Sequence, residues 1–393
     1  MASRGSMSSI GQWTLVLGIA LLMAVPAGAP LQHALAAPWP GAGHRSAPGP
    51  SGSAAGTTSP WGSGVGHVVN AGAGGSRVKP VRPSDGSTAV VADTLVLTND
   101  TVEPGNFLPA NGVDPVALAF DSADGDLYVA DQGSASVTVI DGWTNTVIDS
   151  IPLSFWPKVI AYDPANETIY VGANSTNNLT AINNTTVVGA FDLWNWTGVD
   201  CGPTALAYDG ANNYLYEACP GGTVLAFSLE NETYSYVSVG AGPYALAVDN
   251  ATDTIYVANG GSNSLTVIDG ATQSVTQSIA VGVDPDGLAL DSSNGTVYVS
   301  NYGSGNVTVF NSTTLASVTS IPLGANPTAL TYDSALGYVW VVDNSSDNAT
   351  VLSTTTNSVI ASVVLSIGQE LCPSAILLDP ANQGVYVTGS STD

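Results

Sequence analysis

Basic residues are scarce in this sequence, which contains only six Lys and Arg against 31 Asp and Glu. Because nucleic acids and anionic membrane surfaces are bound through clusters of Lys and Arg, we expect neither to be a partner of the chain beyond residue 87. Charged residues of both signs make up 9% of the chain. So sparse a charge suits either heavy glycosylation or acidic surroundings in which carboxylates are neutral. The basic residues are Arg4, Arg45, Arg77, Lys79, Arg82 and Lys158.

Histidine is also rare, and its three copies, His33, His44 and His67, all precede residue 87. Their positions exclude Ser–His–Asp and Cys–His catalysis, and metal sites built on histidine, from the rest of the chain. Paired carboxylates remain available in principle, but the aspartates fall mainly in turn-like sequence. We therefore expect no catalytic residues and no required cofactor.

The first 86 residues divide into two segments. Arg4 precedes an apolar run over residues 13–25, and residues 34–36 (Ala-Leu-Ala) resemble a cleavage site, so residues 1–36 are predicted to be a secretory signal peptide. An uncleaved N-terminal anchor is the alternative. Residues 37–86 are rich in Gly, Ala, Ser and Pro, which is typical of a disordered linker. This organisation predicts an extracellular or cell-surface location, with no membrane insertion beyond the signal segment.

An internal repeat organises residues 87–393. Each unit has a proline, an aspartate six residues later and an aromatic residue seven residues after the aspartate, and the pattern occurs seven times without a slip. Neighbouring prolines are 40 to 46 residues apart. The prolines are Pro115, Pro157, Pro203, Pro243, Pro285, Pro327 and Pro373; the aspartates are Asp121, Asp163, Asp209, Asp249, Asp291, Asp333 and Asp379; the aromatic residues are Tyr128, Tyr170, Tyr216, Tyr256, Tyr298, Trp340 and Tyr386.

Each unit has the composition of four short strands separated by Asn, Asp, Gly and Ser turns, and no segment has a helical period. The sequence therefore predicts an all-β, seven-bladed β-propeller of four-stranded antiparallel blades over residues 87–393. The seventh unit, from Pro373, holds only two strands. Residues 93–100 and 101–108 resemble its missing third and fourth strands, so we expect the N- and C-terminal strands to close the ring. A further piece of chain is the alternative.

Four of the second strands contain YVAD (128–131), YVAN (256–259), YVSN (298–301) or YVTG (386–389). With their spacing, these motifs resemble the YVTN family of β-propellers, which is familiar from archaeal surface-layer proteins and YncE-like secreted proteins. The resemblance covers about residues 88–393, and it departs at YEAC (216–219) and WVVD (340–343). It implies a propeller fold and favours a role at the cell surface; propellers host many activities, so it indicates function only weakly.

Two further groups of residues suggest local chemistry. Cys201 and Cys219 flank adjacent strands of one repeat and are predicted to form a disulfide, which suits a secreted protein. Cys372 is left over, either unpaired or paired between molecules. Asp121, Asp124 and Asp126 in DSADGD form a weak candidate for a structural calcium site, because oxygen-rich loops bind this ion.

Asparagine glycosylation sequons are frequent, which predicts a glycoprotein unless these sequences only serve turns that enter strands. The candidate asparagines are Asn99, Asn166, Asn174, Asn178, Asn183, Asn184, Asn195, Asn231, Asn250, Asn294, Asn306, Asn311, Asn344 and Asn348.

The connections between repeats supply candidate binding residues at the mouth of the central channel: Phe155, Trp156, Trp194, Trp196 and Glu370. Exposed aromatic rings there could stack on sugars or anchor a protein partner, although packing between blades is the alternative. We interpret the chain as a glycosylated surface-layer-type protein with a binding, adhesion or envelope role, whose partners are other cell-surface proteins or glycans. The alternative is a secreted propeller enzyme, lactonase-like or quinone-dependent, with its site at the channel mouth.

Overall fold

The computed structural model describes residues 93–97, 107–109, 112–173, 178–193, 201–324, 326–365, 372–381 and 384–389, the first two ranges by their backbone alone. The predicted signal peptide and linker lie outside these residues. All of them belong to one compact unit, Ser53–Asp393. Apart from one 3-10 helix, η1 (Gly260–Ser262), the regular elements of the described chain are strands. No helix in this part of the chain is long and apolar enough to cross a membrane.

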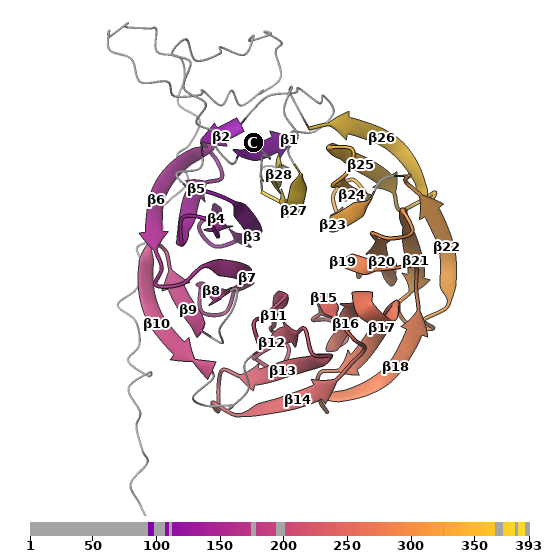
Figure 1. Ribbon diagram of the computed structural model, residues 1–393, viewed down its shortest axis with the longest axis horizontal. Helices are drawn as coiled ribbons and strands as arrows, with labels where there is room; N and C mark the ends of the chain where they lie inside the picture. The colour runs from indigo at the N-terminus through magenta and orange to yellow at the C-terminus, as the bar shows by residue number, and fades with distance from the viewer. Residues whose placement is uncertain are drawn as a thin grey trace, which may run out of the picture. The chain divides into compact units, whose positions relative to one another are not determined.

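The described strands form seven four-stranded sheets, paired antiparallel throughout (Figure 1). Six sheets consist of four consecutive strands, and they confirm the prediction of a β-propeller with four-stranded antiparallel blades. These are blade 1 with β3 (Pro115–Asp121), β4 (Asp126–Asp131), β5 (Ser136–Asp141) and β6 (Thr146–Pro152); blade 2 with β7 (Pro157–Asp163), β8 (Thr168–Ala173), β9 (Asn178–Asn183) and β10 (Thr186–Asp192); and blade 3 with β11 (Ala205–Asp209), β12 (Tyr214–Cys219), β13 (Thr223–Ser228) and β14 (Tyr234–Ser238).

The remaining three are blade 4 with β15 (Pro243–Asp249), β16 (Thr254–Asn259), β17 (Ser264–Asp269) and β18 (Ser274–Ala280); blade 5 with β19 (Pro285–Asp291), β20 (Thr296–Asn301), β21 (Asn306–Asn311) and β22 (Ser317–Pro322); and blade 6 with β23 (Pro327–Asp333), β24 (Tyr338–Asp343), β25 (Asn348–Ser353) and β26 (Ser358–Val364).

The seventh sheet, here called the composite sheet, joins both ends of the described chain. Its strands lie in the order β2 (Phe107–Pro109), β1 (Asp93–Leu97), β28 (Gly384–Gly389) and β27 (Pro373–Asp379). Strand β1 pairs with β28 from Thr94 opposite Thr388 to Leu97 opposite Val385. Six blades are thus formed by continuous chain, and the predicted count of seven depends on this composite sheet.

The first strand of each unit lies at the centre of the ring and the fourth at its rim (Figure 1). Each aspartate of the repeat ends its inner strand and accepts backbone N–H groups of the following turn through its side chain, as Asp121 does from Ala123 at 2.8 Å and Asp163 from Ala165 at 2.8 Å. The same bond recurs in six of the seven units, and in the remaining one Asp291 accepts from the backbone N–H of Asn294, three residues on, because a short carboxylate can close such a turn on its own backbone. The interpretation of these aspartates as turn residues is confirmed.

The repeated aromatic residues are buried between sheets, and the hydroxyl groups of several of the tyrosines connect one sheet to the next. Tyr128 donates to the Asn184 carbonyl oxygen at 2.9 Å, and Tyr298 donates to Asn357 Oδ1 at 3.1 Å. In each case the partner lies in the turn before the outer strand of the following blade. A tyrosine can serve both purposes because its ring is apolar and its tip is polar.

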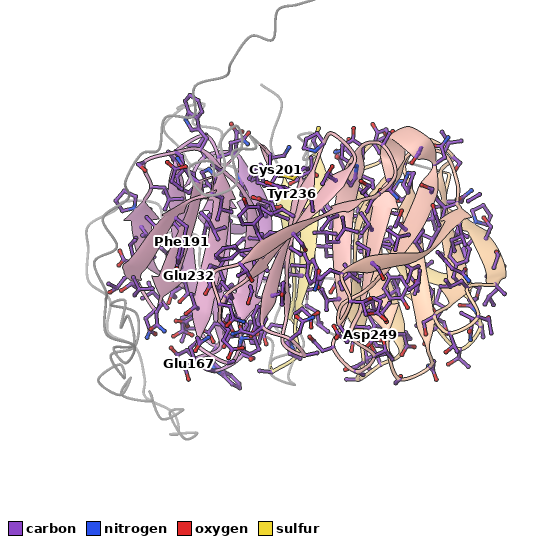
Figure 2. All side chains as sticks on the ribbon, turned by 90° about the horizontal axis from the view of Figure 1, so that it is seen from below. Glu167, Phe191, Cys201, Glu232, Tyr236 and Asp249 are labelled. Carbon is purple, nitrogen blue, oxygen red and sulfur yellow. A yellow bond between two sulfur atoms is a disulfide. The ribbon has the colours of Figure 1, made fainter. Side chains whose placement is uncertain are left out.

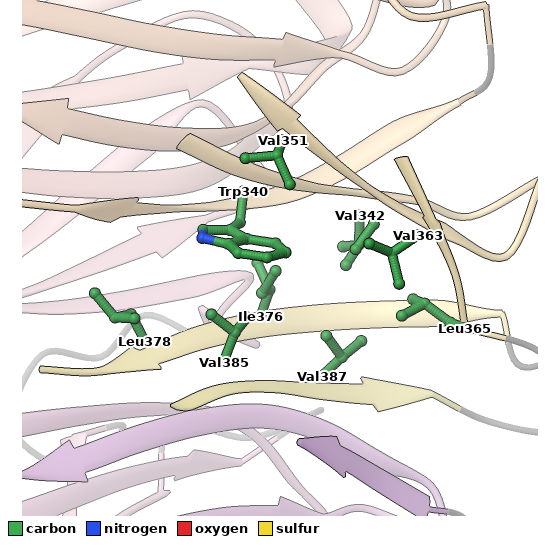
Figure 3. Close-up of a cluster of buried hydrophobic side chains, with 10 residues drawn as sticks. Trp340, Val342, Val351, Val363, Leu365, Ile376, Leu378, Val385 and Val387 are labelled. Carbon is green, nitrogen blue, oxygen red and sulfur yellow. The ribbon is translucent and has the colours of Figure 1, made fainter. Parts of the chain in front are cut away.

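The core consists of apolar clusters between neighbouring sheets. In one of them, Trp340 and Val351 of blade 6 face Ile376, Val385 and Val387 of the composite sheet (Figure 3). Such clusters follow from the alternation of side chains along each strand, which presents apolar residues to both neighbours. Neighbouring sheets are therefore held together by packing of their faces. The loops at either end of the ring remain available for function.

Candidate functional site

The disulfide lies at the end of the ring opposite to the turn aspartates (Figure 2). Cys201 and Cys219, the predicted pair, are bonded, with 4.9 Å between their Cα atoms. They border a surface hollow of about 380 Å³ that also takes in Thr223, Tyr236 and Ser238. Its lining has hydroxyl groups and one aromatic ring but no charged side chain, so it suits a neutral, polar ligand such as a sugar ring.

The predicted binding residues are only partly in the described chain. Trp156 is 62% exposed, so its ring is available for contact. Phe155 is half-buried and packs against the apolar cluster between blades 1 and 2, which favours the alternative of packing between blades for this residue. Trp194, Trp196 and Glu370 lie outside the described residues, and their contribution stays a prediction.

Glu217 in β12 is a buried carboxyl group that the sequence patterns did not single out as a site. Its side chain is 2% exposed, and neither carboxylate oxygen has a hydrogen-bond partner in the described part of the protein. Burial raises the pKa of this group to about 7. The sequence marks this position, because YEAC (216–219) has a glutamate where every other unit has a valine. These valines are all buried: Val129, Val171, Val257, Val299, Val341 and Val387.

The surroundings of Glu217 explain how the larger side chain fits. It is in register with Leu206 and Leu225 and so faces blade 2. There it lies beside Gly172, where an added Cβ would be 4.0 Å from Glu217 Oε1 but only 2.6 Å from Val159 Cγ2. The other units have Ala, Ser, Val or Thr at the position of Gly172. A smaller residue on one blade thus accompanies a larger one on the next.

A second set of residues lies where the inner strands begin. In six of the seven units the pairing register shifts just after the repeated proline, so that the next residue bulges from the ladder. Lys158 is one of these residues, and burial lowers its pKa. Asp286 is another; burial, and then the nearby Asp284 carboxylate, raise its pKa to about 6. Perturbed groups at this end make it the second candidate binding region.

The calcium expectation at Asp121, Asp124 and Asp126 is not supported. Asp121 Oδ1 accepts hydrogen bonds from the backbone N–H groups of Ala123 and Asp124 and is therefore committed to the turn. No group of three His, Cys, Asp or Glu side chains within the described ranges is placed to hold a metal ion.

The sequon asparagines differ in how available their side-chain nitrogens are. Asn166 and Asn294 are exposed, but each donates its Nδ2 hydrogen to a turn aspartate at 2.8 Å. Asn231 and Asn250 are exposed, and their Nδ2 atoms donate no hydrogen bond within the described chain. They are therefore the best-placed acceptors. Asn178, Asn183, Asn184, Asn306, Asn311, Asn344 and Asn348 are half-buried, whereas Asn99, Asn174 and Asn195 lie outside the described residues.

Comparisons with known proteins identify the fold alone. No family model and no curated protein sequence matches this chain. Among solved structures, the hydrazine synthase of Kuenenia stuttgartiensis is similar to it with a TM-score of 0.60 and 15% sequence identity, over 75% of this chain and 99% of that one. At this identity the likeness supports a β-propeller and carries no activity across.

Proposed function

We propose that this chain is an extracellular, glycosylated, non-catalytic propeller of the YVTN type, which acts at the cell surface in an envelope or adhesion role. The observation that carries the proposal is the composition of the rim. The outer strands β14, β18, β22 and β26, on four consecutive blades, contain no charged residue. They nevertheless expose large apolar side chains: Tyr234, Tyr236, Val275, Val318, Val359, Ile360 and Val364.

The physical reason concerns strand edges. An outer strand presents unpaired N–H and C=O groups, and most proteins protect such an edge with Lys, Pro or a bulge. Strands β18, β22 and β26 each have a bulge and β22 ends in Pro322, but none of the four outer strands has a charged side chain. A rim without charge over four blades is suited to lateral contact with other surface proteins, with glycans or with further copies of the chain. The exposed sequons Asn231, in the turn before the outer strand β14, and Asn250, in the turn after the inner strand β15, are consistent with a glycosylated protein.

We expect two lysines on β26, Val359→Lys with Ile360→Lys, to abolish lateral assembly of the full chain without unfolding it. Both residues are exposed, at 44% and 48%, so the change should cost little stability. Sedimentation velocity over a range of concentrations, with circular dichroism as the folding check, measures the effect.

Val283→Lys is the matched control, because Val283 is 53% exposed in the connection between blades 4 and 5 and not on the rim. It should assemble like the wild type. A wild-type chain that stays monomeric at every concentration, and binds neither envelope material nor glycans, would show that the proposed role is wrong.

We infer further that the composite sheet serves as the seventh blade and closes the ring. Strand β27 lies beside both β3 and β23, and Tyr386 of β28 donates a hydrogen bond to Asn145 Oδ1 of blade 1 at 2.6 Å. This bond is the counterpart of the bond from Tyr298 to Asn357 within the continuous blades.

Tyr386→Phe should therefore lower the free energy of unfolding by about 1 kcal/mol, the usual cost of one lost hydrogen bond. Tyr298→Phe is its control and should cost a similar amount in the same urea titration. If Tyr298→Phe destabilises the protein and Tyr386→Phe does not, the composite sheet is not docked on blade 1 in solution.

A second candidate function is favoured by the residues at the start of the inner strands. Lys158 and Asp286 have pKa values shifted toward neutrality, as expected of groups that handle a ligand or a proton. This region would be the site if the chain were a ligand-binding or catalytic propeller. A small molecule that protects the wild type from thermal unfolding, but not Lys158→Met, would favour this second function over the first.

A further inference from the structure

The last residue of the second strand has the same setting in four blades. Asp131, Asn259, Asn301 and Asp343 are all buried, and each is followed seven residues later by a threonine of the third strand. The strand register is identical in the four cases, because the residue two positions earlier is always paired with that threonine. The four blades therefore allow Asn and Asp to be compared at equivalent positions within a single chain.

The two asparagines use their Nδ2 hydrogens to satisfy this setting. Asn259 donates to Thr266 Oγ1 at 2.9 Å and to the carbonyl oxygens of Val257 and Ser264 at 3.2 Å. Asn301 repeats the pattern with Thr308 Oγ1 at 2.8 Å and with two backbone carbonyls. The tip of the side chain is thus surrounded by backbone carbonyl oxygens, which accept hydrogen bonds. The position therefore favours a side chain that can donate a hydrogen bond.

The two aspartates cannot donate while they are ionised. Asp131 Oδ2 accepts from Thr138 Oγ1, and Asp343 Oδ2 accepts from Thr350 Oγ1, each at 2.6 Å. The other oxygen of each carboxyl group is buried with no hydrogen-bond partner in the described chain, and the same is true of Oδ1 in Asn259 and Asn301, so the four sites differ only in the donor that Asn supplies. A carboxylate has only acceptors, whereas a protonated carboxyl group has one O–H donor. Only the protonated form reproduces what Asn259 and Asn301 do at the equivalent position.

No described positive charge offsets these carboxyl groups. Asp131 faces the composite sheet, away from Lys158 in blade 2, and the segment that crosses above it carries Asp114. Asp343 is followed by Asp347 in the adjoining turn. Asp343 faces blade 5, where Asp284 and Asp286 lie at the same end of the sheet as Asp343.

A carboxyl pair between blades 3 and 4 supports the same conclusion. Asp209 is fully buried, and burial, together with the neighbouring Asp253 carboxyl group, raises its pKa to about 6. Two carboxyl groups close together cannot both ionise easily, so one of them tends to keep its proton.

We propose that this protein works in acidic surroundings, where Asp131 and Asp343 are neutral carboxylic acids that take the place of Asn259 and Asn301. Burial raises the pKa of Asp131 from 3.8 to about 6, and it raises the pKa of Asp343 as well. Because the folded state holds the proton more tightly than the unfolded state, the stability from Asp131 is fully present below about pH 3.8. It is lost as the pH rises through about 6, so the folded protein is favoured by acid.

The test compares reciprocal variants of the full chain by urea unfolding at pH 4 and pH 7.5. The wild type should be more stable at pH 4. Asp131→Asn with Asp343→Asn should reduce this difference, by roughly a hundredfold in the folding equilibrium constant for Asp131 alone. Asn259→Asp with Asn301→Asp should enlarge it. Asp269→Asn, the same change in a turn where hydrogen bonds from Thr272 lower the pKa of the aspartate, should not reduce it.

Infrared spectroscopy of the wild type gives a second readout that does not depend on the folding of a variant. A carbonyl band of buried, protonated carboxyl groups should be present at pH 5 and should disappear near neutral pH. The inference is overturned by the absence of that band, by a wild type that is less stable at pH 4 than at pH 7.5, or by an unchanged difference in Asp131→Asn with Asp343→Asn.

Discussion

Glu217→Gln should raise the free energy of unfolding by about 3 kcal/mol at pH 8 and change it little at pH 4. The wild-type carboxyl group is buried without a hydrogen-bond partner among the described residues, and its pKa is raised from 4.5 to about 7. Its protonated form is therefore favoured by folding. The stability that it contributes is fully present below about pH 4.5 and is lost as the pH rises through 7, whereas glutamine has no charge to bury.

Unfolding midpoints in urea, measured every half pH unit from 4 to 8, would show this as a flatter profile for the variant. Glu230→Gln is the control, because Glu230 is exposed in the turn after β13 and its replacement should leave the profile unchanged. If Glu217→Gln followed the wild-type profile throughout, Glu217 would have to be hydrated in solution or paired with a residue outside the described ranges.

Replacing Cys201 and Cys219 together by alanine should lower the free energy of unfolding by about 3 kcal/mol. The disulfide closes a loop with a sequence separation of 18, and in the chain-entropy account the gain comes from the restricted unfolded chain. The loop includes the inner strand β11, so the loss should appear as earlier unfolding of blade 3 in hydrogen exchange.

Two comparisons isolate this effect. Cys372→Ala changes a cysteine outside the disulfide and should leave stability nearly unchanged. Dithiothreitol should destabilise the wild type to the level of the double variant and leave the double variant as it is. A double variant as stable as the wild type would show that the bond is absent from the protein in solution or is offset by strain.

The proposed contact surface on the rim and the proposed adaptation to acid both depend on the small number of basic residues in the sequence. With few bases in the chain, the carboxyl groups have little to pair with, and the protein carries its large negative charge only where these groups ionise. In acid that charge falls, so lateral contact between uncharged outer strands meets less repulsion. Assembly that strengthens as the pH falls would join the two proposals, whereas assembly that is independent of pH would separate them.

Much of the architecture follows from local sequence alone. Six of the seven prolines begin an inner strand, because the missing N–H is tolerated there, and Pro203 lies just before one. Each aspartate ends an inner strand, because its carboxylate closes the turn. Both effects involve neighbours within a few residues, and seven repetitions make the pattern unmistakable. The pairing of Cys201 with Cys219 could likewise be foreseen, because the two residues flank adjacent strands of one unit.

The candidate sites depended on contacts between units, which no local pattern contains. The sequence shows Glu217 as a departure from valine, but only the packing of blade 3 against blade 2 buries it beside Gly172. The sequence places Phe155 in the connection between two repeats, where its ring could be exposed, but the apolar cluster between blades 1 and 2 partly buries it. The alternation of side chains along a strand determines by itself which residues share a face. What that face meets, and so whether a carboxyl group keeps its proton, is decided only when a second sheet excludes water from it.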